Sequence, residues 1–361
     1  YGAPKHRFGT ERLRETRQRL TSRRFGESRK LTIAAIGDSF TRTTDRWIGP
    51  VATYLTSLFG DGGGGWLGFG ELSGVINANA RSGYTVSRSG SWDISIYATG
   101  NGPDLGQISS GSAGAKVTAT GPSAPALSGA LLFWIGTADG VVRYRWNGGT
   151  WETLLVQGGV GSLQTGSIAT GMPVSGSWTL EIEVVSGSVT LCGVNLDSAS
   201  NGVRVHKLGS SGSRASQWAA TNASQWQAGL SALAPDLVVV MLGTNDQGLA
   251  RTPSQFATDM ATILDRVRAA RPTTDLLVIM PPENQRTDNV YPMAAYAAAA
   301  LPVVAARDAA WVDTQLLFGV EAGDYANGSA RPWWSTDLVH PDNLTGGRAL
   351  AGAVLDAILN P

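Results

Sequence analysis

Residues 31–40, LTIAAIGDSF, join a continuous run of apolar residues to a Gly-Asp-Ser turn. A short, uninterrupted apolar run that ends in turn residues is typical of a strand buried on both faces of a parallel sheet. We therefore expect a buried strand here, with Ser39 just beyond its carboxyl end. Ser39 is either a nucleophile or only a turn residue, and this stretch alone does not decide between the two.

The same strand pattern recurs along the chain and alternates with helical patterns. Further buried strands are expected in GVRVHKLG (202–209), PDLVVVMLG (235–243), TDLLVIMPP (274–282) and the shorter WVDT (311–314). Helical patterns cover residues 46–60, 215–234, 252–272 and 345–361. This alternation predicts an α/β fold with a doubly wound, flavodoxin-like parallel sheet.

Residues 85–200 break the alternation. They are rich in Gly, Ser and Thr, and they contain short runs of alternating polarity such as AKVTAT. The turns in WNGGTW (146–151) and VVSGSV (184–189) predict hairpins. We expect a jelly-roll-like β-sandwich, inserted into an α/β domain made of residues 31–84 and 201–361. The glycine run at 60–70 is expected to be a flexible loop that leads toward the insert.

The composition is that of an ordinary globular protein, with 28 basic and 28 acidic residues in 361. This balance gives no overall attraction to nucleic acid, and no apolar run is long enough to span a membrane. Charge is uneven, however, because residues 1–30 hold ten Lys or Arg against three Glu. We expect this basic arm to be a solvated helix or tether, with attachment to a larger assembly as the functional alternative. The single cysteine, Cys192, excludes an intrachain disulfide.

The scarcity of histidine narrows the search for a catalytic base. Of three histidines, His6 lies in the basic arm and His206 lies inside a predicted strand, where packing is the usual role. His340 lies in a polar loop before the last helix, and Asp337 precedes it by three residues. That spacing lets the carboxylate reach the imidazole and orient it. A base of this kind would activate Ser39, whose hydroxyl is a weak nucleophile alone.

Two other residues follow predicted strands. Asn245, in VVVMLGTNDQG, could donate its side-chain amide to an oxyanion. Gly209 permits a close backbone approach and could offer its N–H as a second donor. The ordinary alternatives are a strand-ending turn residue for Asn245 and a tight strand-to-helix turn for Gly209.

Ser, Gly, Asn and His in this order resemble the SGNH hydrolases, the GDSL-type esterase family, over residues 31–84 and 201–361. The second block reads Leu-Gly-Ser-Ser-Gly, where the family often has Asn-x-Gly. The resemblance implies no metal or organic cofactor. It implies a nucleophile at Ser39, oxyanion donors at Ser39 N–H, Gly209 and Asn245, and the rest of a triad at Asp337 and His340.

The insert is similar to carbohydrate-binding-type modules, which accompany SGNH enzymes that deacetylate polysaccharides or peptidoglycan. Its five tryptophans (Trp92, Trp134, Trp146, Trp151, Trp178) could stack on sugar rings, but filling the sandwich core is their commoner role. Trp333 and Trp334 either wall an acyl or sugar pocket or pin the loop that holds Asp337.

We therefore expect a serine esterase, extracellular, in the cell envelope or on a virion, that removes acyl groups, above all acetyl groups, from an acylated polysaccharide or other glycan. A lipolytic or short-acyl esterase, or an acyltransferase, would use the same triad. The alternative from another class is a glycan-binding structural component of a virion tail or cell surface.

Overall fold

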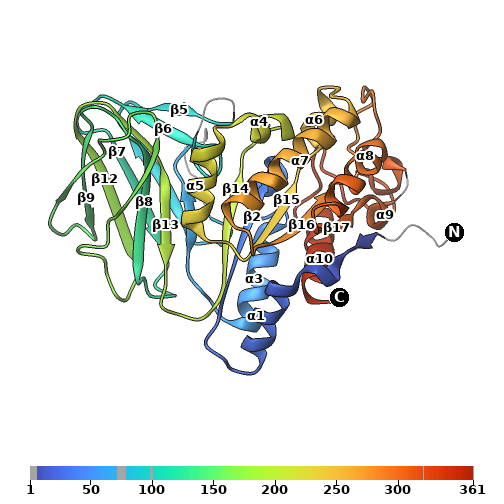
Figure 1. The fold of residues 1–361 in the computed structure, drawn as a ribbon, viewed down its shortest axis with the longest axis horizontal. Helices are drawn as coiled ribbons and strands as arrows, with labels where there is room; N and C mark the ends of the chain where they lie inside the picture. The colour runs from blue at the N-terminus through green and yellow to red at the C-terminus, as the bar shows by residue number, and fades with distance from the viewer. Residues whose placement is uncertain (1–5, 71–78, 98–100, 320, 361) are drawn as a thin grey trace.

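The computed structural model describes residues 6–70, 79–97, 101–319 and 321–360, and a six-stranded sheet forms its centre (Figure 1). The strand order is β1-β17-β16-β15-β2-β14. All neighbours pair in parallel except β1 (Arg7–Phe8), which is antiparallel to β17. The parallel strands are β2 (Lys30–Gly37), β14 (Gly202–Gly209), β15 (Leu237–Met241), β16 (Asp275–Met280) and β17 (Ala310–Asp313). Their order along the sheet is the flavodoxin-like one, and they coincide with the five predicted strands.

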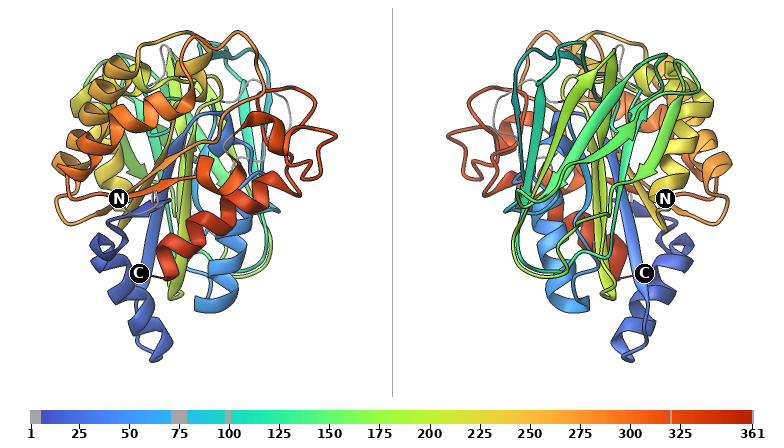
Figure 2. Two further views of the ribbon diagram at one scale, coloured as in Figure 1. Left: turned by 90° about the vertical axis from the view of Figure 1, so that its right-hand side faces the viewer. Right: turned by 90° about the vertical axis from the view of Figure 1, so that its left-hand side faces the viewer.

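Helices cover both faces of this sheet (Figure 2). One face packs against α1 (Arg14–Arg24), α3 (Ile48–Phe59) and α10 (Gly346–Leu359). The other packs against α4 (Ala215–Ala220), α5 (Ala223–Leu233), α7 (Pro253–Ala270) and α8 (Met293–Ala305). The expected helix at 215–234 is divided in two because the Asn222 side chain caps the start of α5. The shorter helices are α2 (Ser39–Arg42), α6 (Thr244–Gly248), α9 (Gln315–Phe318) and the 3₁₀ turns Thr10–Arg12 and Ala322–Tyr325.

The basic arm packs on the α/β body, so the expectation of a solvated helix or tether is wrong. Strand β1 extends the edge of the sheet, and Leu13 and Leu20 are buried in the core. Basic side chains of the arm meet carboxylates of the body, at Arg7–Asp356, Arg12–Asp308 and Arg19–Asp236. The basic residues of the arm therefore form ion pairs with the acidic body, and the arm is part of the folded α/β domain.

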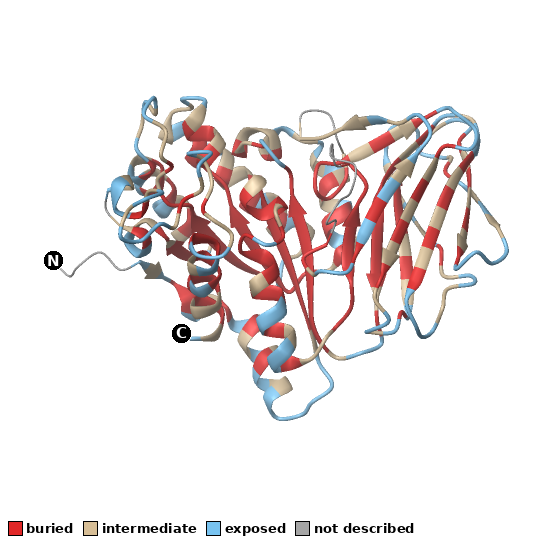
Figure 3. Cartoon of the chain, turned by 180° about the vertical axis from the view of Figure 1, so that it is seen from behind, coloured by how far each residue is buried: buried red, intermediate tan, exposed pale blue. Residues whose placement is uncertain are grey.

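Two antiparallel sheets lie between α3 and β14. One has the order β10-β9-β12-β7-β4; the other has the order β11-β8-β13-β6-β5, with β3 also paired to β13. Their strands are β3 (Gly65–Gly68), β4 (Thr85–Ser89), β5 (Asp93–Ser95), β6 (Gln107–Ser110), β7 (Lys116–Gly121), β8 (Gly129–Ile135), β9 (Val141–Trp146), β10 (Glu152–Leu155), β11 (Leu163–Ser167), β12 (Trp178–Ser186) and β13 (Val189–Asp197). Buried side chains from both sheets form one core, and outer strands alternate buried with more exposed residues (Figure 3).

Two local expectations for this region are wrong. The turn at 184–189 joins no hairpin, because β12 and β13 belong to different sheets and the chain crosses between them there. The glycine run at 60–70 is no flexible loop, since β3 lies within it and all four of its residues are buried. A Cβ built at Gly193 would overlap the carbonyl oxygen of Leu67, so the glycine lets β3 and β13 come together.

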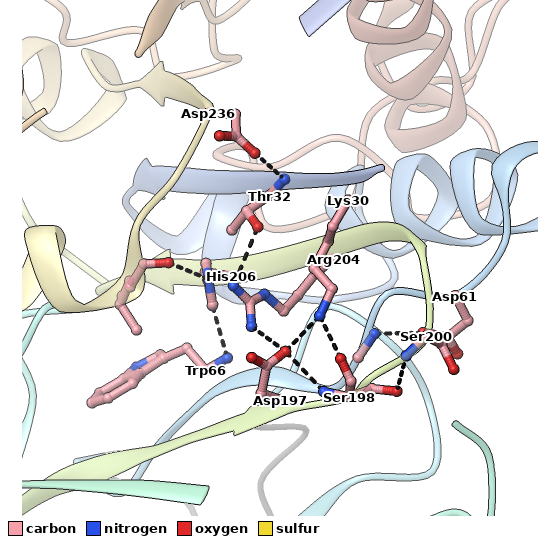
Figure 4. Close-up of polar contacts among 12 residues, drawn as sticks. Lys30, Thr32, Asp61, Trp66, Asp197, Ser198, Ser200, Arg204, His206 and Asp236 are labelled. Atoms are coloured by element: carbon pink, nitrogen blue, oxygen red, sulfur yellow. Dashed lines mark hydrogen bonds and ion pairs between the residues drawn. The ribbon is translucent and has the colours of Figure 1, made fainter. Parts of the chain in front are cut away.

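Polar contacts join β14 of the parallel sheet to the antiparallel sheet that contains β3 and β13 (Figure 4). The Nδ1 of His206 accepts a hydrogen bond from the backbone N–H of Trp66 at 3.0 Å, and its Nε2 lies 3.2 Å from the Leu233 carbonyl oxygen. Burial lowers the pKa of His206 well below its usual value. Arg204 pairs with Asp197 at 2.7 Å in the same junction. His206 is thus a neutral packing residue, as its place in a strand indicated.

Candidate active site

Ser39 is the first residue of α2, and only Asp38 separates it from the end of β2. The turn is tight, because a Cβ built at Gly37 would overlap Oγ1 of Thr41, four residues later. The Asp38 side chain accepts a hydrogen bond from the backbone N–H of Phe40 at 2.9 Å and so caps the short helix. Ser39 therefore lies at the carboxyl end of β2, which stands between β15 and β14, on the edge of the sheet where open α/β folds bind their ligands.

Ser39 and His340 meet although 301 residues separate them in the chain. The Oγ of Ser39 lies 2.7 Å from Nε2 of His340, and Nδ1 of the same ring lies 2.6 Å from Oδ2 of Asp337. Oδ1 of Asp337 accepts hydrogen bonds from the Ser335 hydroxyl and from the backbone N–H groups of Val339 and His340. Hydroxyl, imidazole and carboxylate thus form one continuous chain of hydrogen bonds.

Trp334 holds the loop of Asp337 against the body. It is only 2% exposed, and its ring packs near those of Phe40, Phe318 and Tyr325 at 5.4 to 6.4 Å. Its burial leaves no indole face for a substrate, so of the two interpretations the pinning of the loop fits Trp334. Trp333 is half-buried, and its ring lies 5.2 Å from that of Phe318. A substrate contact by Trp333 stays a prediction.

Burial, together with a neighbouring cation, favours the neutral form of His340. Burial lowers the pKa of His340, and the nearby Arg46 guanidinium lowers it further, against the opposing effect of Asp337. Burial alone would raise the pKa of Asp337, but hydrogen bonds from His340, Ser335 and the backbone lower it well below its usual range. At neutral pH the pair is therefore a neutral imidazole beside a carboxylate, which is the state that can accept a proton from a hydroxyl.

Sequence reasoning missed Arg46, because a lone arginine after the Gly-Asp-Ser turn belongs to no pattern. Its Nη1 donates to the carbonyl oxygen of Ser39 at 2.8 Å, and its guanidinium lies 5.7 Å from the centre of the Phe40 ring. The side chain is largely buried. Arg46 thus fixes the backbone of Ser39 and adds positive charge close to His340.

Asn245 lies on α6, beside the turn that holds Ser39. Its Nδ2 donates to the carbonyl oxygen of Ser213 at 3.0 Å and, in a longer contact of 3.3 Å, to Oδ2 of Asp38. Asp38 is buried, and that burial raises its pKa to about 7. The amide thus links α6 to Asp38, the residue that precedes Ser39. The predicted site residues Ser39 and Asn245 therefore lie close together.

Gly209 has a packing role in the structure. It ends β14 opposite Gly37, and a Cβ built on it would overlap the backbone nitrogen of Arg42. Its role as an oxyanion donor stays a prediction. Gly212 is exposed, has a φ of 81° and directly precedes Ser213, the residue whose carbonyl holds Asn245. Gly212 is therefore a second candidate donor, and the second Gly of Leu-Gly-Ser-Ser-Gly was the signal for it.

The tryptophans of the antiparallel sheets mostly fill their core. Three are buried there: Trp134, Trp146 and Trp178. Trp92 is half-buried and packs against the same core. Trp151 is also half-buried, and the guanidinium groups of Arg143 and Arg145 lie 4.5 and 4.3 Å from its ring centre. The described sheets therefore present no row of open indole faces for sugar rings.

Two further searches cover only the residues with a described structure. In residues 6–70, 79–97, 101–319 and 321–360, no three His, Cys, Asp or Glu side chains gather as ligands of a metal ion would. Over the same ranges, every helix is too short or too polar to cross a bilayer.

Comparison with known proteins bears on the fold and the family. Residues 167–344 match the model of the GDSL-like Lipase/Acylhydrolase family, a stretch that holds Asn245 and His340 but not Ser39. A solved structure described as a peptidoglycan O-acetylesterase in action matches 98% of this chain and 97% of its own, at 18% identity and a TM-score of 0.76. At that identity the likeness shows a shared fold.

A family two carbohydrate esterase from Clostridium thermocellum, solved with cellohexaose, matches 76% of this chain and 98% of its own. Its 13% identity and TM-score of 0.33 are too low to support an argument. Comparison with curated protein sequences finds no relative.

Proposed function

Because the chain carries a GDSL-like lipase/acylhydrolase domain, we propose that it is a serine esterase that removes acyl groups, above all acetyl groups, from a carbohydrate polymer. The observation that carries the proposal is the hydrogen-bond chain from the Ser39 hydroxyl through His340 to Asp337. Nucleophile, base and orienting carboxylate stand in the order that acyl transfer requires.

In the proposed reaction, Oγ of Ser39 attacks the ester carbonyl carbon while its proton passes to Nε2 of His340. The tetrahedral intermediate expels the sugar alcohol, which takes that proton, and the acyl group stays on Oγ. Water then attacks the acyl-enzyme and gives a proton to Nε2. Collapse releases the free acid, and Oγ regains the proton. Asp337 stabilises the imidazolium in both halves of the reaction.

The negative oxygen of each intermediate needs hydrogen-bond donors. Asn245 is the proposed side-chain donor. Its Nδ2 already donates to Ser213 and Asp38, and we propose that it exchanges the longer contact, to Asp38, for the oxyanion. Backbone N–H groups of Ser39 and of Gly209 or Gly212 are the proposed remaining donors. Gly212 is favoured over Gly209, since Gly209 is buried against the chain at Arg42.

The carbohydrate substrate is the part of the proposal that needs most support. It is supported by the fold shared, over nearly the whole chain, with a protein described as a peptidoglycan O-acetylesterase. Polymers of this kind lie in the cell envelope or outside the cell, so we propose that the enzyme acts there. The antiparallel sheets could contact such a polymer, although buried tryptophans give them few stacking surfaces.

The test is acetate release from O-acetylated peptidoglycan and from O-acetylated plant and bacterial polysaccharides. Wild type should release acetate, and Ser39→Ala should not, while both give the same circular dichroism spectrum. A preference for long-chain p-nitrophenyl esters, with no release of acetate from any glycan, would favour a lipolytic esterase instead. Transfer of the acyl group to an added sugar alcohol would identify an acyltransferase.

A further inference from the structure

A loop after β16 connects the two halves of the candidate site. On one side, Nδ2 of Asn284 donates to Oε1 of Gln247 at 2.7 Å, and Gln247 lies on α6 with Asn245. On the other side, the backbone N–H of Gln285 donates to the carbonyl oxygen of Leu338 at 2.8 Å, within the loop of the candidate base. These contacts fix the loop between the proposed oxyanion donor and the proposed base.

The next residue of this loop is Arg286, which is half-buried. Its guanidinium packs against the end of α6, because a Cβ built at Gly248 would overlap its Nη1. It also lies close enough to His340 to help lower the pKa of that residue. The positive charge of Arg286 therefore stands against α6 and close to His340.

Arg286 forms no ion pair with any carboxylate among the residues that the structure describes. The nearest acidic residue before it, Glu283, is occupied by the backbone N–H of Met293 at 2.6 Å and by Asn289 at 3.2 Å. The other charges at the site are also engaged, since Arg46 bonds to the Ser39 carbonyl and Asp337 to His340.

We propose that Arg286 forms an anion subsite beside the ester, and that the preferred substrate is an acylated sugar with a carboxylate near the acylated hydroxyl. A guanidinium offers two parallel N–H groups that match the two oxygens of a carboxylate. The loop that carries Arg286 bonds both to α6, which holds Asn245, and to Leu338, two residues before His340, so an anion held by Arg286 would lie close to an ester bound between them. This inference rests on the proposed esterase function and names the substrate class within it.

The experiment compares two substrates that differ only at C6, methyl glucuronoside with its carboxylate and methyl glucoside with its hydroxymethyl group, each acetylated at the same ring hydroxyl. Wild type should have a KM on the order of tenfold lower for the uronate. Arg286→Gln should remove that difference by raising KM for the uronate alone, and Arg286→Lys should restore part of it. Assays at pH 8 keep His340 neutral in every variant, so its titration does not contribute.

Arg14→Gln is the matched control, since Arg14 is exposed on α1 and the substitution removes the same charge. It should leave both KM values within twofold of wild type. Equal KM values for the two sugars in wild type, or an equal effect of Arg286→Gln on both, would overturn the anion subsite.

Calorimetry separates failure of the subsite from failure of the esterase. The uronate should bind Ser39→Ala on the order of tenfold more tightly than it binds the double variant Ser39→Ala/Arg286→Gln. That result would support the subsite even if wild type hydrolysed neither sugar, in which case only the proposed esterase function would fail. Equal affinities would end the proposal for Arg286 while leaving hydrolysis through Ser39 intact.

Discussion

Arg46 donates a hydrogen bond from Nη1 to the carbonyl oxygen of Ser39 at 2.8 Å, so the candidate nucleophile is held by a buried cation. The same cation lies near His340, whose pKa is lowered first by burial and then by Arg46. Arg46 therefore acts on the site in two ways, through the position of the Ser39 backbone and through the electrostatic potential at the base.

Replacing Arg46 by Met should move the acidic limb of the pH profile to higher pH. His340 must be neutral to accept a proton, and loss of a nearby positive charge raises its pKa. As the pH is lowered, the variant should therefore lose its activity at a higher pH than wild type does. The measurement is kcat/KM for an aryl acetate from pH 4 to 9, which reports the free enzyme.

Arg46→Lys is the control, because it keeps the charge and should leave the acidic limb near that of wild type. The plateau above pH 8 separates the two effects, since any loss of rate there reports the missing bond to Ser39. An acidic limb that stays in place or moves to lower pH in Arg46→Met would contradict the electrostatic role.

Asn245→Ala should lower kcat on the order of a hundredfold or more, with a small change in KM, because it removes a donor needed mainly in the transition state. Asn222→Ala is the matched control, since its amide caps α5 away from Ser39. It should cost about 1 kcal/mol of stability and leave kcat unchanged. A loss of less than threefold in Asn245→Ala would remove Asn245 from the proposed oxyanion site.

Gly209→Ala and Gly212→Ala should differ in stability. The new Cβ at position 209 meets backbone atoms of Arg42, so we expect a loss of about 1–3 kcal/mol or more in the free energy of unfolding. At position 212 the cost is a left-handed φ of 81°, about 1 kcal/mol, and a small shift of the Tyr97 ring, which would lie 3.2 Å from the new Cβ. Urea denaturation measures both. Gly209→Ala as stable as wild type would contradict the packing role assigned to Gly209.

His206 should make the protein less stable in acid. Its pKa in the folded state lies well below the unfolded value of about 6.5, so the unfolded chain binds the proton more readily. The stabilising effect of the neutral ring is fully present above pH 6.5 and is lost as pH falls below it. Wild type should therefore lose stability between pH 7 and 5 faster than His206→Gln, as followed by urea denaturation. Parallel curves for the two proteins would show that His206 does not titrate in this way.

The sequence was enough to predict the parallel sheet and the meeting of Ser39, His340 and Asp337, for separate reasons. The strands were recognisable because a strand covered on both faces must be apolar throughout, as in β15 and β16. His340 was identified by elimination, since the chain has only three histidines. Asp337 followed from a local spacing of three residues, which needs no knowledge of the fold.

Features that depend on packing between distant segments could not be predicted. The sequence around an arginine does not indicate which group its side chain contacts. Neither Arg46 nor Arg286 was therefore predicted to lie near the site. Trp334 could face a pocket or a core, and only the positions of Phe318 and Tyr325 decide for the core. The basic arm looked solvated because its few apolar residues were judged without the surface of the body on which they lie.

The central claim is that Ser39 is the nucleophile, and covalent labelling tests it most directly. A fluorophosphonate reacts with a serine only when a neighbouring base activates the hydroxyl. Wild type should gain the mass of one label, on the peptide that contains Ser39, and His340→Ala should gain none under the same conditions. A label on another residue, or equal labelling of Ser39→Ala, would contradict the account.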